Sequence, residues 1–187
     1  SGPRRIFRDC PPGPMIRSPS ATLRRLLRLG TIAFVCLCPM IGEGADETAK
    51  KEEAPAFLLD KPGGGLISSA DISGKVALLN FWATWCVPCV REIPHLDTAY
   101  NKYRAQGFLI IGINYQQDEK RVLRFMKKSP VSFPMALDLE GDISRLFGVN
   151  ALPVSILIDR EGFIAHKLVG TLSEKVLKIW LEETLDK

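Results

Sequence analysis

Two cysteines separated by two residues are the strongest chemical signal in the sequence. Cys86 and Cys89 lie in the motif of residues 85–89, which follows the apolar run 76–83 and opens a segment, 87–105, that we predict to be helical. A thiolate at a helix N-terminus is stabilised by unpaired backbone N–H groups and by the positive end of the helix dipole. Cys86 is therefore the predicted nucleophile. The spacing brings the second sulfur within disulfide range, so Cys89 is the predicted resolving thiol.

A Cys-x-x-Cys pair can also be half of a zinc site, so the motif alone is ambiguous. The other half is missing from the part of the chain that we expect to fold. Its histidines, His95 and His166, are isolated in a predicted helix and a predicted strand. We therefore favour redox chemistry and expect neither a cofactor nor a bound metal. A copper or zinc chaperone that uses the two thiols remains the alternative function.

The N-terminal part has the pattern of an export signal. Residues 1–45 carry seven arginines against two acidic residues, and the apolar run 29–41 follows three of these arginines. The rest of the chain is close to neutral, which argues against a nucleic-acid partner. We predict a signal peptide or N-terminal membrane anchor with an upstream extension at 1–45, with Met15 as the better start. The protein is thus expected in the periplasm or another extracytoplasmic compartment.

The remaining sequence alternates between strand and helix patterns. A charged segment, 46–54, is the predicted linker, and one domain is expected over 55–187. Helices are predicted at 87–105, 118–129 and 142–147 and after Ser173, and strands at 56–59, 66–68, 76–83, 108–114, 133–137, 154–159 and 163–169. This order predicts an α/β fold with a mixed central sheet and helices on both faces.

Two segments of the sequence resemble the thioredoxin superfamily. They are residues 80–89, which include the cysteine motif, and residues 152–154, and the sequence is most similar to the exported TlpA/ResA-type thiol-disulfide oxidoreductases. The resemblance covers roughly 54–187 and implies a thioredoxin-like fold with a cis peptide bond before a proline. It also implies a groove for extended polypeptide substrates, formed by Trp85, Val87, Pro88, Leu152 and Pro153.

The same resemblance points to a carboxylate near the cysteines. Thioredoxins commonly carry an aspartate where this chain has Asn80, whereas the TlpA/ResA-type branch often has asparagine there and a glutamate at the position of Glu92. Cys89 and Glu92 are three residues apart on one helix, so Glu92 could move protons to and from the resolving thiol. The alternative is a solvated glutamate paired with Arg91 or another neighbour. The sequence leaves both open.

The predicted activity is disulfide exchange with exported protein thiols or disulfides, as a reductant. The resemblance implies cytochrome c maturation or metal-site assembly as client processes. We also expect a membrane electron donor as a partner, and a monomer. Peroxide reduction by a related peroxiredoxin needs a threonine three residues before the reactive cysteine. Thr84 is only two residues before Cys86, so the sequence disfavours that reaction.

Overall fold

The computed structural model describes residues 51–185. The predicted signal or anchor at 1–45, its start residue and most of the predicted linker lie outside the described residues. The elements are β1 (Leu58–Asp60), β2 (Leu66–Ser68), α1 (Ser69–Ile72), β3 (Val76–Trp82), α2 (Val87–Tyr103), a 3-10 turn (Arg104–Gln106), β4 (Phe108–Tyr115), α3 (Glu119–Lys128), β5 (Met135–Asp138), α4 (Asp142–Leu146), β6 (Val154–Ile158), β7 (Ile164–Val169) and α5 (Glu174–Leu185). Within this range no helix is long and apolar enough to cross a membrane.

The strands form one mixed sheet in the order β2-β1-β5-β4-β3-β6-β7. The central strands β3, β4 and β5 are parallel, and the pairs on either side of them are antiparallel. The carboxyl ends of the three parallel strands therefore meet at one edge of the sheet, a common place for a functional site in α/β proteins. The cysteine motif follows β3 at this edge.

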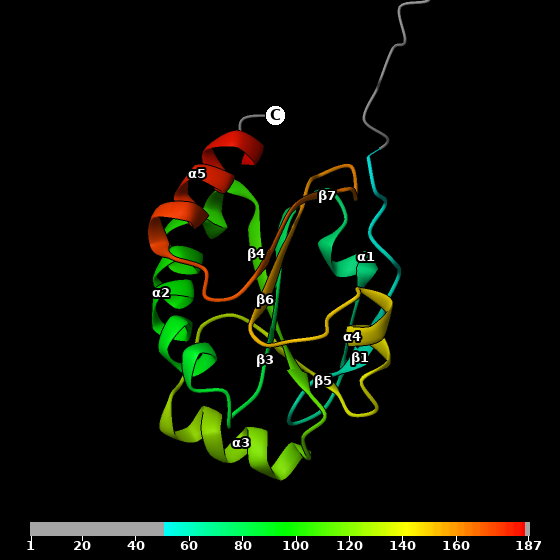
Figure 1. Cartoon of the computed structure of the whole chain (residues 1–187), viewed down its shortest axis with the longest axis vertical. Helices are drawn as coiled ribbons and strands as arrows, with labels where there is room; N and C mark the ends of the chain where they lie inside the picture. The colour runs from blue at the N-terminus through cyan, green and yellow to red at the C-terminus, as the bar shows by residue number, and fades with distance from the viewer. Residues whose placement is uncertain (1–50, 186–187) are drawn as a thin grey trace, which may run out of the picture. The chain divides into compact units, whose positions relative to one another are not determined.

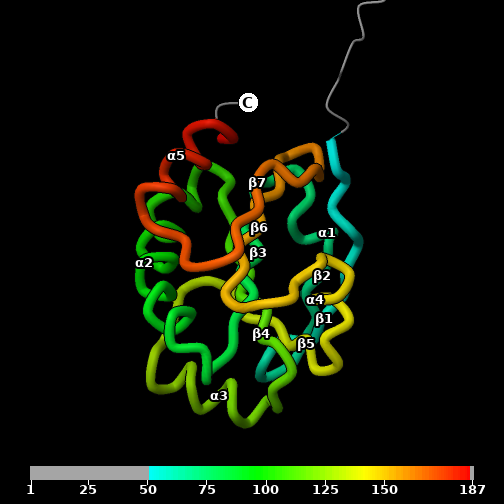
Figure 2. The backbone as a smooth tube through the Cα atoms, in the orientation of Figure 1, coloured from blue at the N-terminus to red at the C-terminus, as the bar shows by residue number. Residues whose placement is uncertain are grey.

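Helices cover both faces of the sheet. Helices α2 and α5 lie on one side and α1 and α4 on the other, as Figure 1 and the backbone tube of Figure 2 show. Helix α3 lies near one end of the strands, and its Val122 belongs to the same apolar cluster as residues of α2 and α5. Two apolar clusters fill the interfaces. One contains Ile93 of α2 and Leu177 of α5, and the other contains Ile72 of α1 and Phe147 at the end of α4. Every residue of β3 is buried because helices cover both of its faces.

One glycine in the sheet has a packing reason. Gly112 lies in β4, where an added Cβ would collide with the Met135 side chain and crowd the ring of Phe133. The side chains from β5 and the segment before it fill the space that a Cβ would need. A glycine inside a buried strand often marks such a close approach.

The predicted elements are confirmed with small shifts at their ends. Strand β5 begins at Met135, because Pro134 has no N–H to donate and only its carbonyl accepts a bond, from Gly112 N–H at 3.0 Å. The short helix α1 was not predicted. The Ala54 N–H donates to the Gly162 carbonyl in the turn before β7, and the Glu52 carbonyl accepts a bond from the Ile164 N–H at the start of β7. Contacts with the sheet therefore begin inside the segment that we predicted as a linker.

Candidate active site

The two cysteines form a disulfide at the start of α2. Their Cα atoms are 5.3 Å apart, and Cys86 is the N-cap residue of the helix. Its Sγ accepts a hydrogen bond of 3.3 Å from the Cys89 N–H, which the helix itself leaves without a partner. The turn before the helix is closed by the Cys86 N–H, which donates to the Ala83 carbonyl at 3.1 Å. The first sulfur therefore sits where the backbone favours negative charge.

The two sulfurs differ in their access to the surface. Cys89 has no exposed area, whereas 5% of Cys86 is exposed. Trp85 and Val87, on either side of Cys86, are among the most exposed apolar residues that the structure describes, at 62% and 58%. A client can thus reach the disulfide only from the side of Cys86.

A groove of about 310 Å³ lies beside the motif and is lined by Trp85, Tyr115, Arg145 and residues 149–152. Of the five residues predicted to form it, Trp85 and Leu152 line the groove, Val87 and Pro88 are exposed at the helix start, and Pro153 is buried behind it. The peptide bond between Leu152 and Pro153 is cis, as the resemblance implies. Tyr115 and Arg145 are groove residues that the sequence did not indicate.

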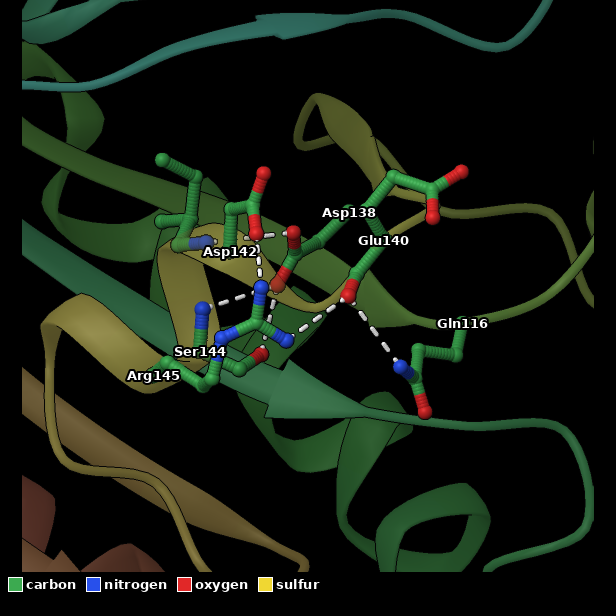
Figure 3. Close-up of polar contacts among 7 residues, drawn as sticks. Gln116, Asp138, Glu140, Asp142, Ser144 and Arg145 are labelled. Carbon is green, nitrogen blue, oxygen red and sulfur yellow. Dashed lines mark hydrogen bonds and ion pairs between the residues drawn. The ribbon is translucent and has the colours of Figure 1, made fainter.

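Arg145 places a positive charge at the groove wall, and the carboxylate of Asp142 on the same helix balances this charge. The guanidinium donates to the Glu140 carbonyl at 3.0 Å and is paired with Asp142 (Figure 3). The Asp138 carboxylate holds the start of α4 by accepting bonds from the N–H and the hydroxyl of Ser144 at 2.8 and 2.7 Å. Asp138 is 2% exposed and ends β5 at the same sheet edge as the motif.

Glu92 is buried in the interior, with 1% of its surface exposed. Its two oxygens accept hydrogen bonds of 2.8 Å each, one from Asn80 Nδ2 and one from the Leu172 N–H. Burial raises the pKa of Glu92, and these two hydrogen bonds oppose that rise only in part. The solvated glutamate paired with Arg91, which the sequence left open, does not fit this environment. Glu92 and Cys89 both lie on the buried face of α2.

Asn80 connects the glutamate to the sheet. It lies in β3, and its amide nitrogen donates to Glu92 and to the Ser155 hydroxyl of β6, the latter at 3.1 Å. The Asn80 Oδ1 has no hydrogen-bond partner among the described residues. Since an amide cannot take up a proton near neutral pH, Asn80 holds Glu92 in place and leaves the titration to the glutamate.

A second buried network supports the turn before Cys86. The Thr84 N–H donates to Gln117 Oε1 at 2.7 Å, and Gln117 Nε2 donates to the Thr84 hydroxyl at 2.9 Å. The same Oε1 accepts a third bond, of 3.1 Å, from Asn114 Nδ2. Sequence reasoning missed Asn114 and Gln117, although polar side chains at the end of a buried strand and just after it are the signal that could have found them.

Among residues 51–185, no group of three or more histidine, cysteine, aspartate or glutamate side chains could hold a metal ion. His166 instead stacks on the Trp180 ring, with centroids 4.8 Å apart, and pairs with Glu183 at 3.1 Å. The hydroxyl of Thr84, the residue that we compared with the peroxiredoxin threonine, accepts a hydrogen bond from Gln117 Nε2.

Known proteins are similar to this chain in both sequence and fold. The model of the AhpC/TSA family matches residues 51–167. Thiol-disulfide oxidoreductase ResA of Bacillus subtilis (strain 168) is 32% identical over 161 residues, 82% of this chain and 90% of that protein. A crystal structure assigned as thiol:disulfide interchange protein DsbE from Chlorobium tepidum is 32% identical, with a TM-score of 0.69 over 72% of this chain and 96% of that one. StoA from Bacillus subtilis has a TM-score of 0.60 at 27% identity, over 68% and 96% of the two chains.

These similarities extend well beyond the cysteine motif. The structural match with the Chlorobium tepidum protein covers 72% of this chain, so it extends over most of the fold. The predicted resemblance and fold class are therefore confirmed. The chain belongs to the AhpC/TSA family and is a thiol-disulfide oxidoreductase with a thioredoxin-like fold and a redox-active Cys86–Cys89 disulfide.

Proposed function

We propose that the protein reduces disulfides of exported client proteins, with Cys86 as the attacking thiol and Cys89 as the resolving thiol. The observation that carries this assignment is the difference in access, because Cys89 is fully buried and Cys86 alone reaches the surface beside the groove. The Cys86 thiolate attacks a client disulfide and forms a mixed disulfide. Cys89 then attacks the Cys86 sulfur, which releases the client as a dithiol and leaves the enzyme oxidised.

The surroundings of the cysteines favour a reductant over an oxidant. A strong disulfide oxidant owes its potential to a strongly stabilised reduced form. Here the Cys86 sulfur accepts one backbone hydrogen bond, and no side chain of residues 51–185 donates to it. Glu92, buried on the same helix, would repel a thiolate at Cys89 whenever it is ionised. The reduced form is thus only moderately stabilised, which corresponds to a lower potential.

The N-terminal sequence and the resemblance support a proposal for the compartment and the clients. The arginine-rich start and the apolar run 29–41 support export to an extracytoplasmic compartment. Such compartments oxidise thiols, so a reductant there needs an external supply of electrons, and we propose a membrane electron donor for this role. Cytochrome c maturation or metal-site assembly are the proposed client processes, and the enzyme acts as a monomer.

The test is the reduction potential of the Cys86–Cys89 pair in the full chain. The protein is equilibrated in glutathione and dithiothreitol buffers, and the fraction of reduced protein is measured by thiol alkylation and mass spectrometry. We expect a potential nearer to the roughly −270 mV of thioredoxin than to the roughly −120 mV of a strong oxidant. A value close to that of the strong oxidant would contradict the reductant assignment.

A further inference from the structure

We infer that Gln117 is a positioning residue for the attacking cysteine. Its amide group holds the turn of residues 83–86 and thereby keeps the Cys86 sulfur at the N-terminus of α2. This inference rests on the proposed role of Cys86. Gln117 is 33 residues from Thr84 in the sequence, but the two residues are hydrogen-bonded to each other. The Gln117 side chain is buried, with 5% of its surface exposed.

The contact is a two-point clamp on one residue of the turn. Gln117 Oε1 accepts the Thr84 N–H at 2.7 Å, while Gln117 Nε2 donates to the Thr84 hydroxyl at 2.9 Å. Two bonds from one planar amide fix both the backbone and the side chain of Thr84. Since Thr84 lies inside the turn that the Ala83 carbonyl and the Cys86 N–H close, the clamp restricts the position of Cys86.

Strand β4 and the loop that follows it hold the Gln117 amide in place. Asn114 lies opposite Trp82 in the parallel pair β3 and β4, and its amide donates to Gln117 Oε1 at 3.1 Å. Gln116, the preceding residue, has a φ of 49°, a left-handed conformation that is uncommon for a residue other than glycine. Its N–H donates to the Asp138 carbonyl at 2.9 Å. This conformation exposes Gln116 and directs Gln117 into the interior.

The same loop also supports the groove wall. Figure 3 shows two donors that converge on the Glu140 carbonyl, Gln116 Nε2 at 3.1 Å and the Arg145 guanidinium at 3.0 Å. Arg145 lines the groove beside Trp85. The segment after β4 thus contacts two parts of the site. Gln116 contacts the loop before α4, the helix that carries Arg145 of the groove wall, and Gln117 contacts the turn before Cys86.

The reactivity of Cys86 tests this role. The reduced full-chain protein is alkylated with iodoacetamide between pH 5 and pH 9, and the Cys86 peptide is followed by mass spectrometry. In Gln117→Leu we expect alkylation of Cys86 at pH 7 to slow by about tenfold, because a displaced sulfur loses the backbone groups that stabilise its thiolate. Exchange with a client disulfide should slow in proportion. In Thr84→Val, which loses only the hydroxyl bond, about threefold is expected, whereas Thr84→Ser should react like the wild type.

A matched control separates positioning from general stability. The Ser69 hydroxyl accepts the Phe57 N–H at 2.7 Å, which is the same kind of bond at the same length, in a different part of the fold. Ser69→Ala should therefore lower stability in urea as Gln117→Leu does, but leave the pH profile of alkylation unchanged. An unchanged profile in Gln117→Leu, or in Thr84→Val if the leucine variant does not fold, overturns the inference. Alkylation of Cys89 before Cys86 in the wild type would instead overturn the attack order.

Discussion

Replacement of Glu92 by glutamine should change how the stability of the protein depends on pH. The carboxylate is 1% exposed, and burial raises its pKa above the ordinary value of 4.5. The folded protein therefore holds a proton on Glu92 in a pH range where the unfolded chain has already released it. In this range the native state binds more protons than the unfolded state, so stability falls as pH rises.

The size of the effect follows from the number of protons. A difference of one proton lowers the free energy of unfolding by about 1.4 kcal/mol for each pH unit. This loss begins near pH 4.5 and ends at the raised pKa of the folded protein. Glutamine abolishes the titration. An amide flip of Asn80, whose Oδ1 has no partner among the described residues, would let it accept a bond from the introduced amide nitrogen, while the introduced amide oxygen keeps the bond from the Leu172 N–H.

Urea unfolding of the oxidised full chain between pH 4 and pH 8 measures this effect, because the cysteines do not titrate while they are in a disulfide. We expect the wild type to lose stability with rising pH relative to Glu92→Gln, so that the variant is the more stable of the two at pH 8. Glu182→Gln, which changes an exposed carboxylate on α5, is the control and should follow the wild type. Parallel pH profiles of the wild type and Glu92→Gln would refute the reasoning.

Three further outcomes test the site. Cys89→Ser should accumulate a mixed disulfide between Cys86 and a client, visible on non-reducing gels, and Cys86→Ser should not; equal trapping by both variants would reverse the attack order. The reduced protein should bind no zinc in a one-to-one ratio by elemental analysis after gel filtration, because two thiolates leave a tetrahedral site half empty, and tight stoichiometric zinc or copper would favour the chaperone alternative. Trp85→Ala, which removes a 62% exposed groove residue, should raise the KM for a client peptide by about tenfold and leave the reaction with dithiothreitol unchanged; equal effects on both substrates would contradict a role in the groove.

The features that the sequence could predict are those set by short-range geometry. Cys86 and Cys89 lie at the N-terminus of a helix because an apolar strand, a turn and a helical pattern follow one another within a few residues. That Glu92 shares a helix face with Cys89 could be anticipated from their spacing of three residues, but whether this face is buried there was left open. The groove was predicted only in part, because Tyr115, at the end of β4, and Arg145, in α4, are far from the motif in the sequence.

The contacts that the sequence could not predict depend on the register of the sheet and on long-range packing. Gln117 reaches Thr84 because Trp82 and Asn114 are opposite each other in β3 and β4, and no local pattern specifies this register. The Leu172 N–H reaches Glu92 across 80 residues because α5 packs against α2. The burial of Glu92, and with it the direction of its pKa shift, follows from this packing.

The raised pKa of Glu92 connects stability with catalysis. When Cys89 attacks the mixed disulfide, its proton must leave a site where neither Cys89 nor Glu92 has more than 1% of its surface exposed. For ordinary thiols and glutamates the pKa gap is about 4 units, so transfer of this proton to Glu92 would cost about 6 kcal/mol, and each unit by which burial raises the carboxyl pKa lowers that cost by about 1.4 kcal/mol. The pH dependence of stability thus measures the contribution of the carboxyl group to this gap. Because glutamine cannot take the proton, Glu92→Gln should slow the resolution step and let the Cys86 mixed disulfide accumulate in a single turnover, while attack by Cys86 keeps its rate. If no intermediate accumulates although the stability profile changes as expected, the proton of Cys89 leaves by another route and Glu92 is a structural residue of the α2 interface.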